Sequence, residues 1–202
     1  MRITAQEKLA TRERIIEAAL ELFRTQGFET TTTRDIARSA GIAAGTLFNY
    51  FTTKEAIVAS IADEAQARTA ASFDSAERRA SLEESLFALV AAELRQLKPL
   101  RKFIRPVLET VLTPLAAAGD EAAQSLRLRH LEAVSGMVRS HGLPEMPATA
   151  VHLYWTLYTG VLAFWAKDPS PRQEDTLAML DDSMSMFVGW LQKPSAGDNS
   201  ER

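Results

Sequence analysis

Residues 31–57 read TTTRDIARSAGIAAGTLFNYFTTKEAI, and this stretch decides the fold. It contains many helix-forming residues, but the run GIAAG at 41–45 interrupts them. Gly41 permits the left-handed backbone that a sharp corner requires. Thr32 or Thr33 is placed to cap the segment before the corner, because a threonine hydroxyl accepts hydrogen bonds from the first N–H groups of a helix. The stretch therefore predicts two short helices joined by a tight corner.

The two short helices are expected at about 33–40 and 43–51. Their apolar residues have the spacing that packs the pair together and onto a preceding helix. These inward residues are Ile36, Ala37, Ala40, Ile42, Leu47 and Phe51. The residues left outside are Arg34, Ala44, Gly45, Thr46, Asn49 and Tyr50. Two short helices at a steep angle form a helix-turn-helix, and a slim second helix fits the major groove of DNA.

The rest of the chain also has helical periodicity. Capping boxes, T-x-x-E at 52–55 and S-x-x-E at 81–84, mark two helix starts. Further helices are expected at about 7–26, 53–72, 82–97, 101–113, 120–141, 147–166 and 172–192. The tail at 194–202 is polar and is expected to be disordered. The sequence therefore predicts an all-α protein of about nine helices.

Composition limits the classes of protein. The 202 residues include no cysteine, which excludes disulfides, zinc–thiolate sites and thiol nucleophiles. The N-terminus is charged, and no window has the roughly 18 apolar residues of a membrane span. We therefore expect a cytoplasmic protein with no membrane partner. Residues 1–54 carry eight Lys/Arg against six Asp/Glu, and the remainder carries 15 against 20, so the positive end is N-terminal.

Sequence motifs for catalysis are missing. The chain has no G-x-S-x-G, P-loop, dinucleotide fingerprint or H-E-x-x-H, and its three histidines lack metal-ligand spacing. We expect no catalytic residues, no metal and no cofactor. An all-α enzyme with scattered carboxylates is the alternative class.

The run T-T-T-R-D-I-A-x-x-A-G-I-x-x-G-T-L-F-x-Y-F-x-x-K-E-A-I resembles the DNA-binding signature of the TetR family of bacterial transcriptional regulators. The resemblance extends upstream through ERIIEAALELFRTQGFETTT, and so covers about residues 10–60. The remainder is similar to the family only in length and helix count. The resemblance implies a three-helix helix-turn-helix domain over 1–53 and a larger ligand-binding and dimerisation domain over 54–193.

The resemblance also implies roles at DNA. Thr33, Tyr50 and Lys54 are expected to contact backbone phosphates, Lys54 with help from the dipole of its helix. Arg34 is expected at a guanine edge or a phosphate. Gly45 allows close approach of the helix. The remaining expected contacts to bases or phosphates are Ala44, Thr46 and Asn49. Taken singly, Arg34 and Lys54 are also consistent with a solvated surface, Thr33 with a helix cap and Tyr50 with packing.

Two positions depart from the family pattern. Phe48 stands where a tyrosine is usual, so one hydroxyl contact is lost. Ala43 and Ala44 replace a serine and a polar residue, so base reading at this edge would depend on thymine methyl groups.

The last two helices carry apolar stripes. Paired with the same helices of a second copy, they would form a four-helix bundle, and Gly160 would allow close approach. The expected dimer interface is Tyr154, Leu157, Val161, Phe164, Leu177, Leu180, Met184, Phe187 and Leu191. The alternative is that these stripes face only the core of their own protomer.

The resemblance implies a ligand cavity among the helices of about 55–170. A ligand in this cavity would shift the helix that follows the helix-turn-helix, called the reading head below, and so release DNA. Candidate walls are Phe73, Phe87, Leu94, Phe103, Leu108, Leu112, Leu131, Trp155 and Phe164. Candidate polar anchors are Arg105, Arg127, His130 and His152. Apolar candidates outnumber charged ones, which favours a hydrophobic or amphipathic effector, although each aromatic is also consistent with plain core.

These observations predict a homodimeric one-component transcriptional regulator. It would be a repressor that binds a palindromic double-stranded DNA operator and is released by a small effector. The alternatives are an activator, or a ligand-independent DNA-binding protein controlled by a protein partner.

Overall fold

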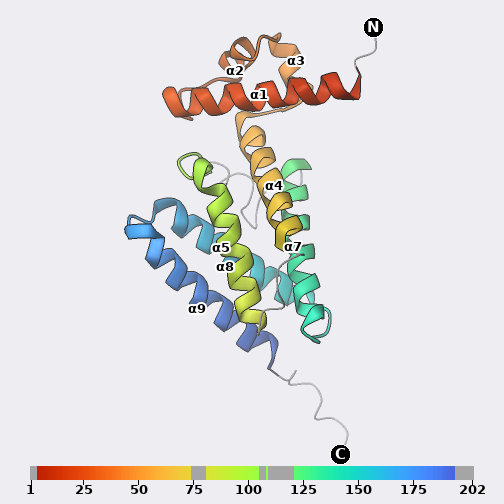
Figure 1. The fold of residues 1–202 in the computed structure, drawn as a ribbon, viewed down its shortest axis with the longest axis vertical. Helices are drawn as coiled ribbons and strands as arrows, with labels where there is room; N and C mark the ends of the chain where they lie inside the picture. Colours follow the sequence, from red (N-terminus) through yellow and green to blue (C-terminus); the bar gives the residue numbers. More distant parts are fainter. Residues whose placement is uncertain (1–3, 74–80, 105–107, 109–120, 194–202) are drawn as a thin grey trace, which may run out of the picture. The chain divides into compact units, whose positions relative to one another are not determined.

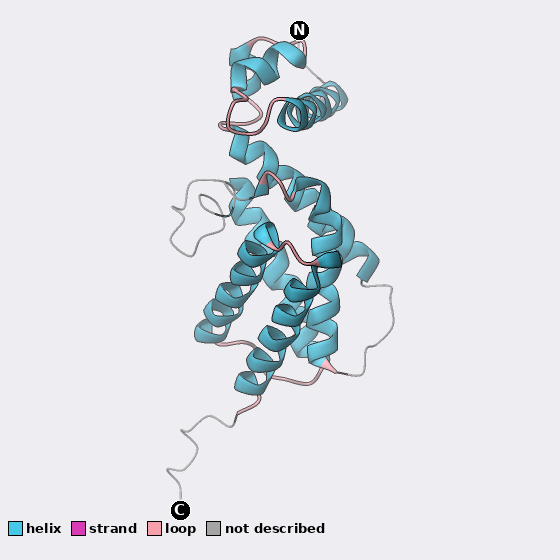
Figure 2. Ribbon diagram, turned by 90° about the vertical axis from the view of Figure 1, so that its left-hand side faces the viewer, coloured by secondary structure: helices cyan, strands magenta, loops and turns pink. Residues whose placement is uncertain are grey.

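The computed structural model describes residues 4–73, 81–104, 108 and 121–193. All regular structure within these residues is helical, as predicted (Figure 1, Figure 2). The α-helices are α1 (Ala5–Thr25), α2 (Thr33–Ser39), α3 (Ala44–Phe48), α4 (Lys54–Phe73), α5 (Leu82–Leu97), α7 (Glu121–Ser140), α8 (Ala148–Lys167) and α9 (Glu174–Leu191). A 3-10 turn, η1 (Lys98–Leu100), directly follows α5, and a second, η2 (Pro171–Gln173), directly precedes α9. The helix expected at 101–113 and the tail at 194–202 lie largely or wholly outside the described residues.

The chain divides into two compact units, which do not follow the predicted boundary at residue 53. The first unit is Met1–Ala65 with Pro99–Arg127, and the second is Gln66–Lys98 with Leu128–Arg202. Helix α4 therefore contributes its first part to one unit and its last part to the other. The functional boundary at residue 53 stays a prediction.

The first unit is organised around α1. A capping box joins Thr4 and Glu7 at its start, which places the helix two residues earlier than predicted. Gly27, with a φ of 92°, follows its end. Ile15 and Phe23 are fully buried on the inner face of α1, against which α2 packs. The aromatic ring of Phe23 also lies 5.6 Å from that of Phe103, centroid to centroid.

The corner between α2 and α3 forms as the sequence predicts. Gly41 has a φ of 68°, in the left-handed region. The N–H of Ile42 donates to the carbonyl of Ala37 at 3.0 Å, and the N–H of Ala40 donates to Ile36 at 2.9 Å. These bonds satisfy carbonyls that the end of a helix would otherwise leave unpaired. Four residues, 40–43, connect the end of α2 to the start of α3.

The start of α4 differs slightly from prediction. The hydroxyl that caps it belongs to Thr53, which accepts from the N–H of Ala56 at 3.0 Å. The box predicted at 52–55 is therefore placed one residue too early, because the helix begins at Lys54 and its cap is the residue before. In the second predicted capping box, at 81–84, the serine is confirmed as the cap: the Ser81 hydroxyl accepts a hydrogen bond from the N–H of Glu84 at 3.1 Å.

In the second unit α9 packs against both α5 and α8. The carboxylate of Asp168 organises the connection between α8 and α9. It accepts from the N–H of Ser170 at 2.7 Å and from the N–H and hydroxyl of Thr176 at 3.0 and 2.5 Å. These hydrogen bonds, with that of Ser170 first, hold the pKa of Asp168 well below its usual range. The carboxylate stays charged and fixes the start of α9.

Gly41→Ala and Gly45→Ala form a matched pair that tests the corner. No atom lies within 4 Å of a Cβ built at either position, so neither change causes a clash. At Gly41 the left-handed backbone costs a side chain about 1–2 kcal/mol, whereas at Gly45, inside α3, alanine gains roughly 0.5–1 kcal/mol. We expect urea unfolding to show a loss of stability for the first variant only. Equal effects would mean that the corner does not depend on its left-handed residue.

Candidate nucleic-acid interface

The two short helices are held by a few buried side chains. Ile36 of α2 and Leu47 of α3 have no exposed surface, and α2 packs on both α1 and α3. Gly45, Phe48 and Asn49 are exposed and share the outward side of α3, while Ala44, Thr46 and Tyr50 are half-buried. Phe48 keeps 50% of its surface accessible. The motif therefore presents a slim helix whose outward side is small, apolar or uncharged.

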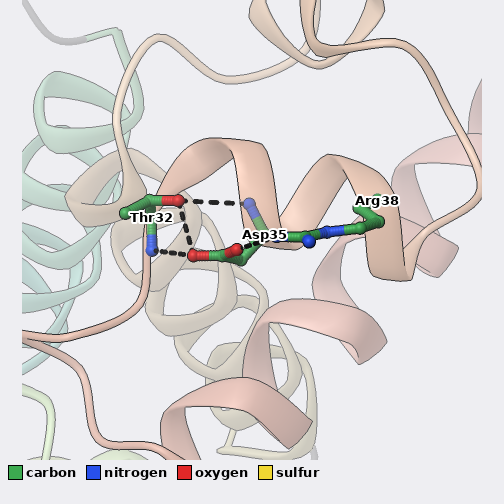
Figure 3. Close-up of polar contacts among 3 residues, drawn as sticks. All are labelled: Thr32, Asp35 and Arg38. Atoms are coloured by element: carbon green, nitrogen blue, oxygen red, sulfur yellow. Dashed lines mark hydrogen bonds and ion pairs between the residues drawn. The ribbon is translucent and has the colours of Figure 1, made fainter.

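The cap of α2 is Thr32 and not Thr33 (Figure 3). The N–H of Asp35 donates to the Thr32 hydroxyl at 3.2 Å, and the Thr32 N–H and hydroxyl donate to the Asp35 carboxylate at 3.2 and 2.6 Å. The bonds from Thr32, that of its hydroxyl first, lower the pKa of Asp35. Asp35 also forms an ion pair with Arg38 (Figure 3). Thr33 and the exposed Arg34 therefore occupy the first turn of α2 without serving as its cap.

The predicted phosphate contact of Lys54 stays a prediction, and within the protein this side chain has a structural role. Its ammonium donates to the carbonyl oxygens of Phe28, Glu29 and Thr31 at 2.7, 3.2 and 3.3 Å. It also lies 4.4 Å from the centroid of the Phe28 ring. A lysine has three donors, and here all three bind the turn that precedes α2. The side chain therefore fixes the chain between α1 and α2.

Arg12 is a positioning residue that the sequence analysis missed. Its guanidinium forms an ion pair with Glu64 and a hydrogen bond with Ser60, both on α4, and lies 5.6 Å from the centroid of the Phe51 ring. The residues it joins are about fifty positions apart along the chain, so no local pattern marks the pair. Arg12 ties the helix that supports the motif to the helix that follows it.

The described candidate wall and anchor residues are divided between the two units. Phe103 and Leu108 are buried in the first unit, to which the half-buried Arg127 also belongs. Leu94, His130 and Trp155 are buried in the second unit, and Phe87 and Leu131 are half-buried there. His152 and Phe164 are exposed on α8. Arg105, Leu112 and the side chain of Phe73 lie outside the described residues.

His130 is the centre of a buried polar cluster in the second unit. Its Nδ1 is 2.9 Å from Oε1 of Glu93, and its Nε2 is 2.9 Å from the hydroxyl of Tyr154. The Tyr158 hydroxyl donates to Oε2 of Glu93 at 3.1 Å, and Nε2 of Gln66 donates to Tyr158 at 3.0 Å. Sequence reasoning found His130 but missed the others. The signal for Glu93 was a lone charge among apolar residues at helical spacing in α5.

Most of the predicted dimer stripe lies in the protomer's own core. Tyr154, Val161, Leu180, Met184 and Phe187 have at most 1% of their surface exposed, so they have no surface to bury against a partner. The prediction that these five contact a second copy is wrong for this structure, because the most regular stripe packs inward. Phe164 and Leu177 are exposed, and Leu157 and Leu191 are half-buried. Met186 and Trp190, which the prediction omitted, are exposed on α9 at 61% and 40%.

One open groove, about 580 Å³ in volume, lies on the second unit beside α5 and α9. It is lined by Glu83, Glu84, Phe87, Ala88, Ala91, Arg95 and Asp181. Phe87 is the candidate wall residue among them. No helix in the described part of the chain is long and apolar enough to cross a membrane. Within the same residues, no three His, Asp or Glu side chains are grouped as a metal site would require.

Comparisons with known proteins agree with this geometry. Residues 15–61 match the model for bacterial regulatory proteins of the tetR family. The HTH-type transcriptional regulator UidR of Escherichia coli K12 is 39% identical over 67 residues, which are 33% of this chain and 34% of UidR. The chain thus matches about a third of the length of this curated relative.

Similarity of fold extends over nearly the whole chain. The crystal structure of Thermus thermophilus FadR, a TetR-family transcriptional repressor in complex with lauroyl-CoA, superposes with a TM-score of 0.72. It is 22% identical and covers 94% of this chain and 100% of its own. A TetR regulator from Rhodococcus sp. RHA1 superposes with a TM-score of 0.70 at 18% identity, covering 90% and 98%. At these identities the superpositions establish the fold alone.

The fold and the motif define a helix-turn-helix protein. Residues 15–61 of this chain are similar to the N-terminal domain of the tetR family of bacterial regulatory proteins.

Lys54→Met separates the structural role of this lysine from a phosphate contact. The variant keeps most of the aliphatic stem but removes three charge-assisted hydrogen bonds, so we expect it to lose about 1.5–3 kcal/mol of unfolding free energy. Lys8→Met, at an exposed position of α1, is the control and should change stability by less than about 0.5 kcal/mol. Chemical denaturation measures both. If Lys54→Met leaves stability unchanged but weakens DNA binding, the main role of Lys54 is the phosphate contact.

Proposed function

We propose that this chain is a homodimeric one-component transcriptional regulator, a repressor that binds a palindromic operator and is released by a small effector. The observation that carries the proposal is the outward side of α3. Gly45, Phe48 and Asn49 stand exposed on a helix that is itself fixed by the buried Leu47. A short, slim, firmly held helix is what direct reading of the major groove requires.

The proposed contacts combine phosphate and base recognition. Arg34 supplies positive charge beside the motif, and Thr33 and Tyr50 supply hydroxyl groups for phosphates. Asn49 and Thr46 present polar groups to base edges, and asparagine pairs well with adenine. Ala43 and Ala44 offer only apolar contact, which suits thymine methyl groups. No residue of α3 is charged, so sequence reading here depends on shape and on uncharged groups.

A second copy is proposed to pack on the exposed side of α8 and α9. This side carries Phe164, Met186 and Trp190, each at least 40% exposed. Gly160 and Gly189 lie on these helices, and no atom lies within 4 Å of a Cβ built at either glycine. Small residues among large apolar ones let two helix pairs approach closely. Such a dimer would place two reading heads on half-sites one turn, about 34 Å, apart.

The effector is proposed to be hydrophobic or amphipathic. The T. thermophilus FadR structure of the same fold holds lauroyl-CoA, an amphipathic molecule, so acyl-CoA is one class to test. Whatever the class, the effector must bind the form that releases DNA more tightly than the form that holds it.

Operator binding tests the reading head. We expect the protein to bind one fragment of the DNA flanking its own gene, with affinity that falls steeply with salt. Arg34→Ala and Tyr50→Ala should each weaken binding about tenfold, the equivalent of 1.4 kcal/mol, and Arg34→Ala should reduce the salt slope by about one. Arg24→Ala is the control, since Arg24 is an exposed arginine paired with Glu21 on α1. If Arg34→Ala and Arg24→Ala bind alike, or no fragment binds specifically, the proposed reading head is wrong.

A matched pair of charge substitutions tests the dimer. Met186 on α9 and Leu128 on α7 are 61% and 60% exposed, so glutamate at either position leaves the core of the protomer intact. We expect Met186→Glu to weaken dimerisation at least tenfold, because it buries a charge in the interface, and Leu128→Glu to leave the dimer unchanged. Sedimentation velocity over a concentration series measures both. A dimer that resists Met186→Glu would place the interface elsewhere.

A further inference from the structure

Five polar side chains from four helices meet inside the second unit. They are Gln66 of α4, Glu93 of α5, His130 of α7, and Tyr154 and Tyr158 of α8. None has more than 3% of its surface exposed. Burying so many polar groups costs free energy that apolar residues of similar size would avoid. This cost suggests a role beyond stability, and the hydrogen bonds of the cluster indicate which one.

Nearly every polar atom of the cluster is satisfied. His130 uses both ring nitrogens, Glu93 uses both oxygens, and both tyrosine hydroxyls are bonded. The exception is Gln66, whose Nε2 donates to Tyr158 while its Oε1 has no hydrogen-bond partner among the described residues. Exchanging the amide oxygen and nitrogen would not help, because it would leave two N–H donors unpaired in the same place. The cluster therefore ends in one unused acceptor.

The charge of the cluster restricts what can bind that acceptor. Glu93 is the acidic member, and burial together with Glu93 raises the pKa of Tyr154 and Tyr158 well above the usual value. The tyrosines therefore stay protonated and uncharged. The carboxylate of Glu93 is the source of negative charge in the cluster. An anion placed beside it would be both desolvated and repelled.

The side chain that Gln66 binds, Tyr158, belongs to a cluster of aromatic rings. The rings of His130 and Tyr158 stack with centroids 3.9 Å apart, and Trp155 lies 5.4 Å from Tyr158. Tyr154 packs against Phe187 at 5.1 Å. Flat apolar molecules are the natural neighbours of such rings.

We propose that Gln66 Oε1 is the polar anchor of the effector site, and that the effector is a flat apolar molecule with one N–H or O–H donor and no negative charge near it. This inference rests on the proposed function, of which it names the effector class. It differs from the arginine anchors expected from the sequence, which would favour an anionic head group.

The first test needs no effector. If Gln66 serves a ligand at the expense of stability, Gln66→Leu should raise the Tm of the full-length protein by about 2–4 °C. Thr69→Val is the matched control, because Thr69 is equally buried on the same helix but does not lack a partner. We expect this control to lower the Tm. A lower Tm for Gln66→Leu as well would show that the cluster is purely structural and would overturn the proposal.

The second test compares probes that differ in one group. Indole and benzothiophene have nearly the same shape, but only indole has an N–H donor, and indole-2-carboxylate adds a negative charge. We expect millimolar indole to raise the Tm of the wild-type protein more than the other two, and this preference to vanish in Gln66→Leu. Equal shifts for indole and benzothiophene, no shift with indole, or a preference that survives in Gln66→Leu would overturn the proposal.

Operator binding of the same samples separates the two proposals. Both the wild-type protein and Gln66→Leu should bind the operator without a probe, since Gln66 lies outside the reading head. If neither protein binds the operator but the wild-type protein still prefers indole, the proposed regulatory function is refuted and the proposed site at Gln66 stands. Operator binding without any preference for indole would refute only the site.

Discussion

The structure depends on the corner at Gly41 and on the few side chains that hold α3 against it. A helix of five residues is far too short to be stable alone, because nucleation costs more than one turn of hydrogen bonds returns. It persists because Leu47 is fully buried and because the left-handed glycine lets only four residues connect α2 to α3. Because α3 is held by its inner side, the side chains on its outer side are not needed to stabilise it.

Helix α4 carries residues that matter to both units. Near its start, Lys54 fixes the turn before α2, and Ser60 and Glu64 bind Arg12 of α1. Two residues after Glu64, Gln66 belongs to the buried polar cluster. Under the proposed function, one continuous helix therefore carries both the residues that bind Arg12 and the proposed effector anchor.

The extent of the similarity to other proteins has a physical explanation. Sequence similarity to UidR covers a third of this chain, whereas similarity of fold to T. thermophilus FadR covers 94% of it. Under the proposed function, reading heads of this type all bind the same DNA double helix, and this shared partner limits which residues are tolerated at many positions. The larger helical part needs only apolar faces of suitable size, and many different sequences satisfy that requirement. Its polar residues, such as Glu93 and Gln66, are then where chains of one fold can differ in what they bind.

The sequence by itself determined the helices, the corner and the class of the N-terminal domain. Caps and stops act within one helical turn, so Gly41, Ser81 and the S-x-x-E box are visible in a linear reading. Only the tertiary structure decided which side of each amphipathic helix faces the core. In the folded chain, Tyr154 and Phe187 face inward, whereas Met186 and Trp190 are exposed. The ammonium of Lys54 binds three backbone carbonyls, and Gln66 binds Tyr158, which lies 92 positions away in the sequence. A periodic pattern shows that a helix has an apolar side, but the partner of that side depends on contacts between residues far apart in the chain.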